Sequence, residues 1–216
     1  MNDRSFKQYQ PSRAVCKGEV MEKTPKAKTN REAIVGAALA AFVDKGFHQT
    51  GIRDIAKRAG VSLGNLYNHF PGKDALIAEI ARIEASEIEH MLAALPETDT
   101  AMDGVCALAA ALLTQASQQA NAVLIADLTA EAMRNRVVAK VFAGNGARIA
   151  EELAALIRQG MDQKEMAPPV PVLDCVALIR DTAQAGGMRA AFQGPAAITG
   201  ALRAQDAMIR RLLARG

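Results

Sequence analysis

A short polar segment, residues 62–69, carries a dense set of hydrogen-bonding side chains within a chain of 216 residues. On a helix, Leu66 would face inward and seven residues would face outward: Ser62, Leu63, Gly64, Asn65, Tyr67, Asn68 and His69. Hydroxyl, amide and imidazole groups donate and accept hydrogen bonds, and the amide of Asn65 matches N6 and N7 of adenine. Leu63 offers an apolar surface for a thymine methyl group. Such a face suits a nucleic-acid groove better than a protein core.

The residues just before this segment have the spacing of a helix-turn-helix. Ile52, Ile55 and Ala56 form one apolar face of a first helix. Gly60 follows Ala56 by four positions and can adopt the positive φ of a tight bend, and Leu66 then seats the second helix on the first. Because Ala56 is small, the two helices can cross closely. This pattern predicts a DNA-reading helix-turn-helix over residues 50–73.

Helix signals flank this motif on both sides. Residues 29–32, Thr-Asn-Arg-Glu, form a capping box that predicts a helix ending at Gly46. Thr50 is expected to be the N-cap of the next helix, and Ser62 the N-cap of the recognition helix. After the Pro71-Gly72 break, Lys73 opens a long helix that we expect to reach about residue 95.

The charges of the chain are divided between its two parts. Residues 1–74 contain 13 Lys or Arg against 7 Asp or Glu, whereas residues 75–216 contain 13 against 16. The positive balance therefore coincides with the helix-turn-helix, as binding to phosphates requires. The alternative explanation for a basic segment alone is a solvated surface.

The remaining sequence is alanine-rich and follows helical periodicity, which predicts an all-α protein of about nine helices. Further helices are expected at about 101–118, 121–134, 136–161, 172–193 and 196–214, with stops at Asn and Pro residues. We expect three regions: a disordered basic arm over 1–28, a helix-turn-helix domain over 29–74, and a helical ligand-binding and dimerisation domain over 75–216. The arm either reaches DNA or is simply a solvated tail.

Metal, cofactor and enzyme chemistry have no sequence signal here. Cys16, Cys106 and Cys175 are far apart and show no metal-ligand spacing. We see no nucleophile–base pair and no glycine-rich phosphate loop, so we expect no cofactor and no enzymatic activity. The absence of a signal-peptide pattern and of a long apolar run predicts a cytoplasmic protein.

The stretch AFVDKGFHQTGIRDIAKRAGVSLGNLYNHFPGKDAL resembles the DNA-binding domain of the tetracycline-repressor (TetR) family. The resemblance implies a homodimeric transcriptional regulator, usually a repressor, that binds double-stranded operator DNA and a small-molecule effector. It also implies that Thr50, Tyr67, His69 and Lys73 hold the DNA backbone, while residues 62–65 face the groove. Gly64 departs from the bulkier residue expected there, so DNA shape would contribute more than base contacts. For Tyr67, the alternative is a ring packed on the first helix with only its hydroxyl exposed.

The second half of the chain predicts an aliphatic ligand site and a dimer face. From residue 75 onward the aromatic residues are Phe142 and Phe192 alone, which argues against a pocket that stacks planar ligands. Candidate ligand-binding residues are Met102, Gln115, Asn121, Asp127, Met133 and Arg134, although methionines at helical spacing are more often core. Small residues that recur along one helix predict a close helix–helix contact at the dimer interface: Ala183, Gly186, Gly187 and Ala191.

The expected mechanism is release of a palindromic operator when a ligand changes the spacing of the two recognition helices. Two alternatives remain open within regulation, namely an activator or a regulator that answers a protein partner. A helical-bundle enzyme with a structural helix-turn-helix is a distant third.

Overall fold

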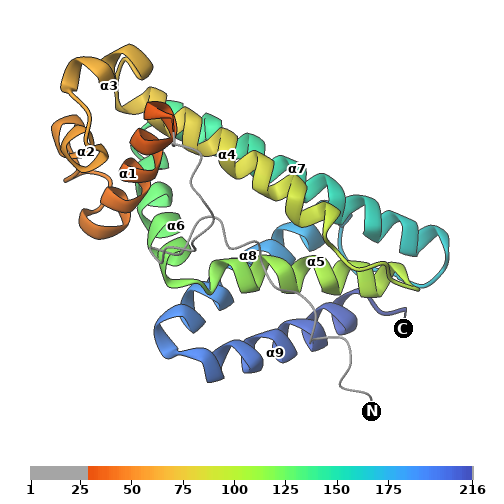
Figure 1. Cartoon of the computed structure of the whole chain (residues 1–216). Coiled ribbons are helices and arrows are strands. Elements are labelled where there is room, and N and C mark those ends of the chain that lie inside the picture. Colours follow the sequence, from red (N-terminus) through yellow and green to blue (C-terminus); the bar gives the residue numbers. More distant parts are fainter. Residues whose placement is uncertain (1–28, 216) are drawn as a thin grey trace. The chain divides into compact units, whose positions relative to one another are not determined.

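The computed structural model of the chain describes residues 29–215, which form nine α-helices and no strand (Figure 1). The helices are α1 Asn30–Lys45, α2 Ile52–Ala59, α3 Leu63–His69, α4 Lys73–Ala93, α5 Ala101–Ala116, α6 Gln119–Ala132, α7 Arg136–Asp162, α8 Val172–Gln193 and α9 Pro195–Leu213. Among these residues, the β-type pairing is limited to an isolated bridge between Met166 and Ala214. The expected all-α architecture is therefore confirmed. The arm predicted over residues 1–28 lies outside the described part of the chain.

Four of the predicted helix-end and turn signals are found as expected, and Thr50 is the exception. Thr29 forms the capping box with Glu32, and Gly46 ends α1. Ser62 accepts a hydrogen bond from the backbone of Asn65 at the start of α3. Gly60 closes α2 in the left-handed conformation, with φ 69° and ψ 26°. This conformation favours glycine, which explains why the turn has this residue at this position.

The prediction for Thr50 was wrong. Gly51, and not Thr50, is the N-cap of α2, and its N–H donates to the carboxylate of Asp54 at 3.1 Å. The Thr50 hydroxyl instead faces the carbonyl oxygens of Gly46, at 2.8 Å, and Ala41, at 3.1 Å. A hydroxyl that donates to the end of α1 is turned away from the first turn of α2, where the Asp54 carboxylate accepts the N–H of the N-cap residue Gly51.

The described residues divide into two compact units. The N-terminal unit comprises residues 29–87 and 123–145, and the C-terminal unit comprises residues 88–122 and 146–215. The N-terminal unit thus holds α1, α2 and α3 together with parts of α4, α6 and α7. The expected boundary at residue 74 between a DNA-binding domain and a ligand-binding domain stays a prediction. In the structure, residues 75–87 and 123–145 pack in the same unit as the helix-turn-helix.

The core of the N-terminal unit joins the helix-turn-helix to α4, α6 and α7. Phe42, Ile55, Leu66 and Phe70 are all almost completely buried. They belong to one apolar cluster that also contains Val138 of α7. Burial of such side chains contributes about 1.5–3 kcal/mol each. The recognition helix α3 therefore rests on this core through the buried Leu66 and the partly buried Leu63. The core itself extends far beyond the motif.

The C-terminal unit is built on α5, which packs against both α8 and α9, while α8 also packs against α9 (Figure 1). Its core is aliphatic, with Val105, Leu108, Leu153 and Ile179 fully buried. Glu165 stabilises the start of α5 because its carboxylate accepts the backbone N–H groups of residues 101 and 102 at 3.1 and 3.2 Å. Across the described residues, no helix is long and apolar enough to span a membrane.

Candidate DNA-binding surface

The outer face of α3 presents most of the side chains that were predicted to contact DNA. Ser62, Gly64, Tyr67, Asn68 and His69 are exposed, and the side chain of Tyr67 is 49% exposed. In the alternative interpretation, the ring of Tyr67 packs on the first helix and exposes only its hydroxyl. The observed exposure does not fit that alternative. A capped two-turn helix with one buried leucine and five exposed positions can enter a groove while the leucine stays packed in the core.

Leu63 and Asn65 are only half-exposed. Leu63 packs against the apolar cluster of the N-terminal unit. The side-chain oxygen of Asn65 is buried and lacks a hydrogen-bond partner among the described residues. A bidentate contact with adenine needs both the oxygen and the nitrogen of this amide at the surface. Base reading by Asn65 therefore requires rotation of its amide, and it stays a prediction.

Thr50, which the resemblance assigned to the DNA backbone, is 2% exposed. Its hydroxyl is engaged by the carbonyl groups of Gly46 and Ala41. A phosphate contact by this hydroxyl would require it to leave both carbonyls. In the structure, Thr50 joins the end of α1 to the start of α2 and so maintains the turn.

Lys73 is also engaged inside the fold. Its ammonium donates to the backbone carbonyl of Phe47 and lies 3.8 Å from the centre of the Phe47 ring and 5.7 Å from that of Phe42. Burial lowers the pKa of Lys73, and the negative charges of Glu131 and Asp74 oppose this shift. The first residue of α4 thus contacts the α1–α2 turn, and its predicted phosphate contact stays untested.

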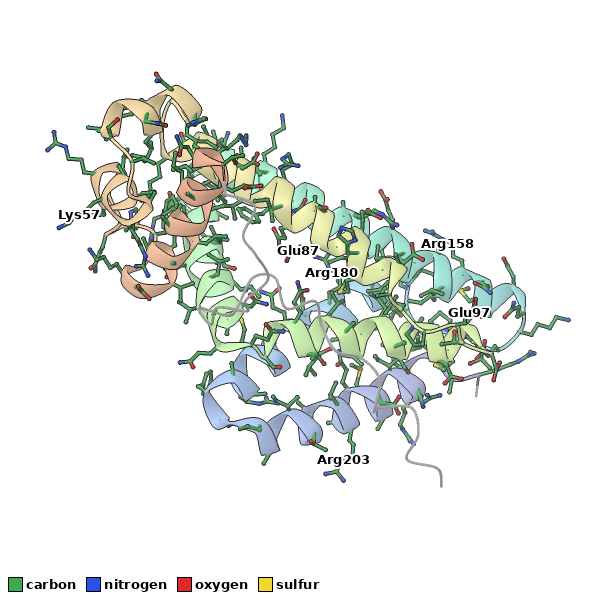
Figure 2. All side chains as sticks on the ribbon, viewed as in Figure 1. Lys57, Glu87, Glu97, Arg158, Arg180 and Arg203 are labelled. Carbon is green, nitrogen blue, oxygen red and sulfur yellow. The ribbon has the colours of Figure 1, made fainter. Side chains whose placement is uncertain are left out.

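Two basic residues of α2 were missed by the sequence reasoning. Arg53 and Lys57 are exposed, and no carboxylate among residues 29–215 forms an ion pair with either of them. Figure 2 shows Lys57 on the outer side of α2. Their neighbours differ, because Arg58 pairs with Asp44 at 2.5 Å. The missed signal was the i, i+4 spacing of two cations opposite the buried face of α2.

Unpaired cations beside a groove-sized helix are what phosphate binding needs. An exposed ammonium or guanidinium releases condensed counterions when it meets a phosphate, which drives association at low salt. A guanidinium that already pairs with a carboxylate must give up that pair first. Arg53 and Lys57 are therefore the best placed cations of α2, and they add two positively charged groups to the polar face of α3.

The helices that carry this surface lie within a segment that matches a known protein family. Residues 34–80 match the family described as "Bacterial regulatory proteins, tetR family". The regulator UidR of Escherichia coli K12, an HTH-type transcriptional regulator, is 28% identical over 145 residues, which span 67% of this chain and 72% of UidR. Residues 34–80 therefore carry a TetR-family DNA-binding domain, and the chain as a whole is similar to transcriptional regulators of this family. Its relatives are DNA-binding regulators and not enzymes.

Solved structures agree over nearly the whole chain. GusR of Salmonella enterica is 25% identical and superimposes with a TM-score of 0.72, covering 89% of this chain and 99% of GusR. A transcriptional regulator from Saccharomonospora viridis, solved in complex with choline, has a TM-score of 0.74 at 16% identity and covers 86% and 98% of the two chains. The second likeness shows the fold alone. Together they extend the TetR-type fold from the DNA-binding helices to α9.

The residues predicted to bind a ligand are not gathered into one site. Met102 and Gln115 lie near opposite ends of α5, about 20 Å apart at 1.5 Å per residue. Met102 belongs to the core, whereas Met133 is 83% exposed. Asp127 is used by the fold, since it accepts the N–H of Phe47 at 3.0 Å. The other two candidates are Asn121, which donates to the carbonyl of residue 115 at 3.0 Å, and Arg134, which is exposed.

One buried polar group of this regulator had no signal in the sequence. Gln205 of α9 is 6% exposed, and neither its oxygen nor its nitrogen has a hydrogen-bond partner among the described residues. A buried amide without partners is costly. No other side chain of α8 or α9 in the described chain shares this property.

The small residues of α8 make their close contact within the chain. A Cβ on Gly187 would lie 2.5 Å from the carbonyl oxygen of Leu113 and 2.6 Å from the Cβ of Ala116, both on α5. Ala183 and Gly186 are buried, and Ala191 is half-buried. The predicted close approach therefore exists, but α5 of the same chain already occupies it. Which residues contact a second copy stays a prediction.

Metal binding has no structural basis in the described residues. No group of three or more His, Cys, Asp or Glu side chains comes together there as a metal site would need. Burial raises the pKa of the Cys106 thiol to about 12, and burial also raises the pKa of Cys175. Both thiols are therefore protonated and shielded near neutral pH.

Proposed function

We propose that this TetR-family regulator is a cytoplasmic, dimeric repressor that binds a palindromic operator and leaves it when a small molecule binds the helical region of residues 75–216. The observation that carries the DNA-binding part is the exposed face of α3 beside Arg53 and Lys57, which form no ion pair with any carboxylate of residues 29–215. Two such faces must lie about 34–36 Å apart to read successive major grooves. Repression follows because a bound dimer would exclude other proteins from the same DNA.

The outer faces of α8 and α9 support dimer formation. Leu178 and Phe192 of α8 are 44% and 79% exposed, and they lie about four helical turns apart. Two large apolar side chains on one exposed helix favour burial against another protein surface. Figure 2 shows Arg203 pointing outward from α9, where it would lie at the polar edge of such an interface. This surface replaces the buried glycines as the proposed dimer face.

The composition of the C-terminal unit limits the chemistry of its effector. Phe192 is the one aromatic residue in 88–122 and 146–215, and it is exposed. The interior is made of aliphatic side chains, alanines and methionines. Such a lining adapts to shape but offers no ring for stacking. We therefore propose that the effector has an aliphatic body and not a planar aromatic one.

The test of DNA binding is an electrophoretic mobility shift with DNA from the region upstream of the protein's own gene. We expect sequence-specific complexes whose affinity falls steeply with salt. Replacement of both Arg53 and Lys57 with Ala should reduce the slope of log K against log salt by about 1.8, at about 0.9 per lost phosphate contact. Arg158→Ala, on α7 in Figure 2, removes one charge far along the sequence and should leave the slope unchanged. No specific complex at low salt would refute the proposal.

A transcription reporter, used together with the mobility shift, separates the alternatives. An activator would bind the operator and raise transcription from a reporter, whereas a repressor would lower it. A regulator that answers a protein partner would keep its operator complex in the presence of every small molecule and lose it on addition of that partner.

A further inference from the structure

The backbone N–H and C=O of Phe47, in the α1–α2 turn, each form a hydrogen bond with a charged side chain. Its N–H donates to the carboxylate of Asp127 at 3.0 Å, and its carbonyl accepts a hydrogen bond from the ammonium of Lys73. Asp127 belongs to α6 and lies 80 residues further along the chain, while Lys73 is the first residue of α4. Both partners are charged, and hydrogen bonds to charged groups are about twice as strong as neutral ones.

The side chain of Phe47 is held as firmly as its backbone. It is 6% exposed, and its ring centre lies 5.0 Å from that of Phe42. The ammonium of Lys73 lies 3.8 Å from the centre of the Phe47 ring, within the range of a cation–π interaction. Next to it, Gly46 has a φ of +80°, and a Cβ there would lie 3.2 Å from the Asp127 oxygen. The carboxylate thus fits against the one residue type that leaves room for it.

A second carboxylate of α6 faces the next residue of the same turn. Glu131, one helical turn after Asp127, is 7% exposed. Its Oε2 lies 3.3 Å from Nε2 of His48 but forms no hydrogen bond of good geometry. Helix α6 therefore presents two carboxylates, a turn apart, to Phe47 and His48. The charge of Glu131 also acts on Lys73, whose ammonium completes this cluster.

We infer that Asp127, Glu131 and Lys73 form a clamp on the α1–α2 turn that positions the DNA-reading helices, and that Lys73 is a positioning residue and not a phosphate contact. Helix α2 begins five residues after Phe47, at Ile52, so the placement of this turn sets the placement of α2 and α3. To reach a phosphate, Lys73 would have to leave the Phe47 carbonyl, two ring faces and a nearby carboxylate. Within the described part of the chain, Arg53 and Lys57 have no such contacts. The inference rests on the DNA binding proposed above, and not on the effector.

The salt dependence of binding distinguishes positioning from phosphate contact. The probes are an operator duplex and an unrelated duplex of equal length, with the full-length protein. Lys73→Met keeps the length and apolar stem of the side chain but removes the charge. If Lys73 binds a phosphate, the slope of log K against log salt should fall by about 0.9 on both duplexes. If it positions the helices, both slopes and the affinity for unrelated DNA should stay as in the wild type. Only operator affinity should then fall, by about tenfold or more.

Asp127 gives a test in which the two effects have opposite signs. Removal of a negative charge from a DNA-binding protein should strengthen binding if electrostatics alone acts. We expect Asp127→Ala to weaken operator binding instead, because the Phe47 N–H loses its acceptor. Asp127→Asn should restore most of the operator affinity, since the amide oxygen still accepts that N–H. Asp74→Asn is the matched control, as it removes an exposed carboxylate next to Lys73 that does not touch the turn.

Circular dichroism and thermal unfolding show whether each variant is folded at the binding temperature. If Asp127→Ala does not fold, the Lys73→Met slopes decide alone. A lowered slope on both duplexes, or operator binding by Asp127→Ala that is as tight as or tighter than the wild type, would overturn the inference. If the wild-type protein bound neither duplex, the proposed function itself would be refuted.

Discussion

The two adjacent glycines of α8 should respond to the same substitution with opposite signs. A Cβ at Gly186 would meet only the Leu113 side chain, at 3.5 Å, which is an ordinary contact. A Cβ at Gly187 would lie 2.5 Å from the backbone oxygen of Leu113 and 2.6 Å from the Cβ of Ala116. We therefore predict that Gly186→Ala stabilises the protein and Gly187→Ala destabilises it.

The magnitudes follow from helix propensity and packing. Alanine is favoured over glycine inside a helix by about 1 kcal/mol, so Gly186→Ala should gain about that amount. Gly187→Ala gains the same propensity but forces α8 away from a backbone group of α5, and such overpacking costs about 1–3 kcal/mol. The net loss is about 1 kcal/mol. The two variants should thus differ by about 2 kcal/mol, or about 4–8 °C in unfolding midpoint.

Thermal unfolding by circular dichroism, at one fixed protein concentration, measures this difference. The concentration must be held constant because association shifts the midpoint by mass action. Gly144→Ala is a useful reference, since nothing lies within 4 Å of a Cβ at this exposed position of α7. It should stabilise the protein about as much as Gly186→Ala does.

Equal stabilisation by Gly186→Ala and Gly187→Ala would refute the packing argument, because it would mean that α5 does not limit the space at Gly187. A third outcome concerns the dimer. If Gly187→Ala left the monomer as stable as before but weakened self-association in sedimentation experiments, the close contact would lie between two chains.

Three further predictions concern buried polar groups. Burial raises the pKa of Glu84 despite its hydrogen bond from Asn145, so the charged carboxylate opposes folding above that pKa. Glu84→Gln should therefore raise the unfolding midpoint at pH 7–8. This gain should shrink as the pH falls through the pKa of Glu84 in the folded protein. Gln205→Met should stabilise the protein by about 1–3 kcal/mol in denaturant titrations, because it removes a buried amide without partners; a loss of stability would show that the amide is satisfied. Cys106 and Cys175 should react with a thiol reagent only as fast as the protein unfolds, which peptide mass spectrometry can follow; rapid labelling of either would contradict their burial.

Local signals in the sequence predicted the fold well because they act over a few residues. Thr29 and Ser62 cap helices as expected, and Gly60 takes the left-handed conformation that the turn needs. Thr50 is the informative failure. Its own side chain can cap the following helix or bind the preceding one, and Asp54 supplied a competing cap. Sequence spacing alone does not say which of two local partners a hydroxyl selects.

The site was less predictable where a partner lies far along the chain. The outward face of α3 follows from one buried leucine and helical periodicity, and five of the seven residues expected to face outward are exposed. Leu63 and Asn65 are only half-exposed. The surroundings of Lys73 depend on Asp127 and Glu131, whose positions against the turn no local pattern encodes. Gly187 shows the same limit: small residues indicate a close helix contact, which α5 makes here, but they do not say whether a second chain also contacts this helix.

The division between free and engaged cations has a consequence for regulation. Arg53 and Lys57, without an ion pair among residues 29–215, can supply the salt-dependent attraction to any DNA, whereas Lys73 joins α6 in holding the turn that positions α2 and α3. Helix α6 begins in the C-terminal unit and continues into the N-terminal unit. An effector that acted through α6 would therefore change the positions of α2 and α3 and leave the contacts of Arg53 and Lys57 with DNA phosphates available. Its addition should lower operator affinity while the affinity for unrelated DNA, and its salt slope, stay constant. An effector that lowered both affinities equally would have to act on the charged surface itself.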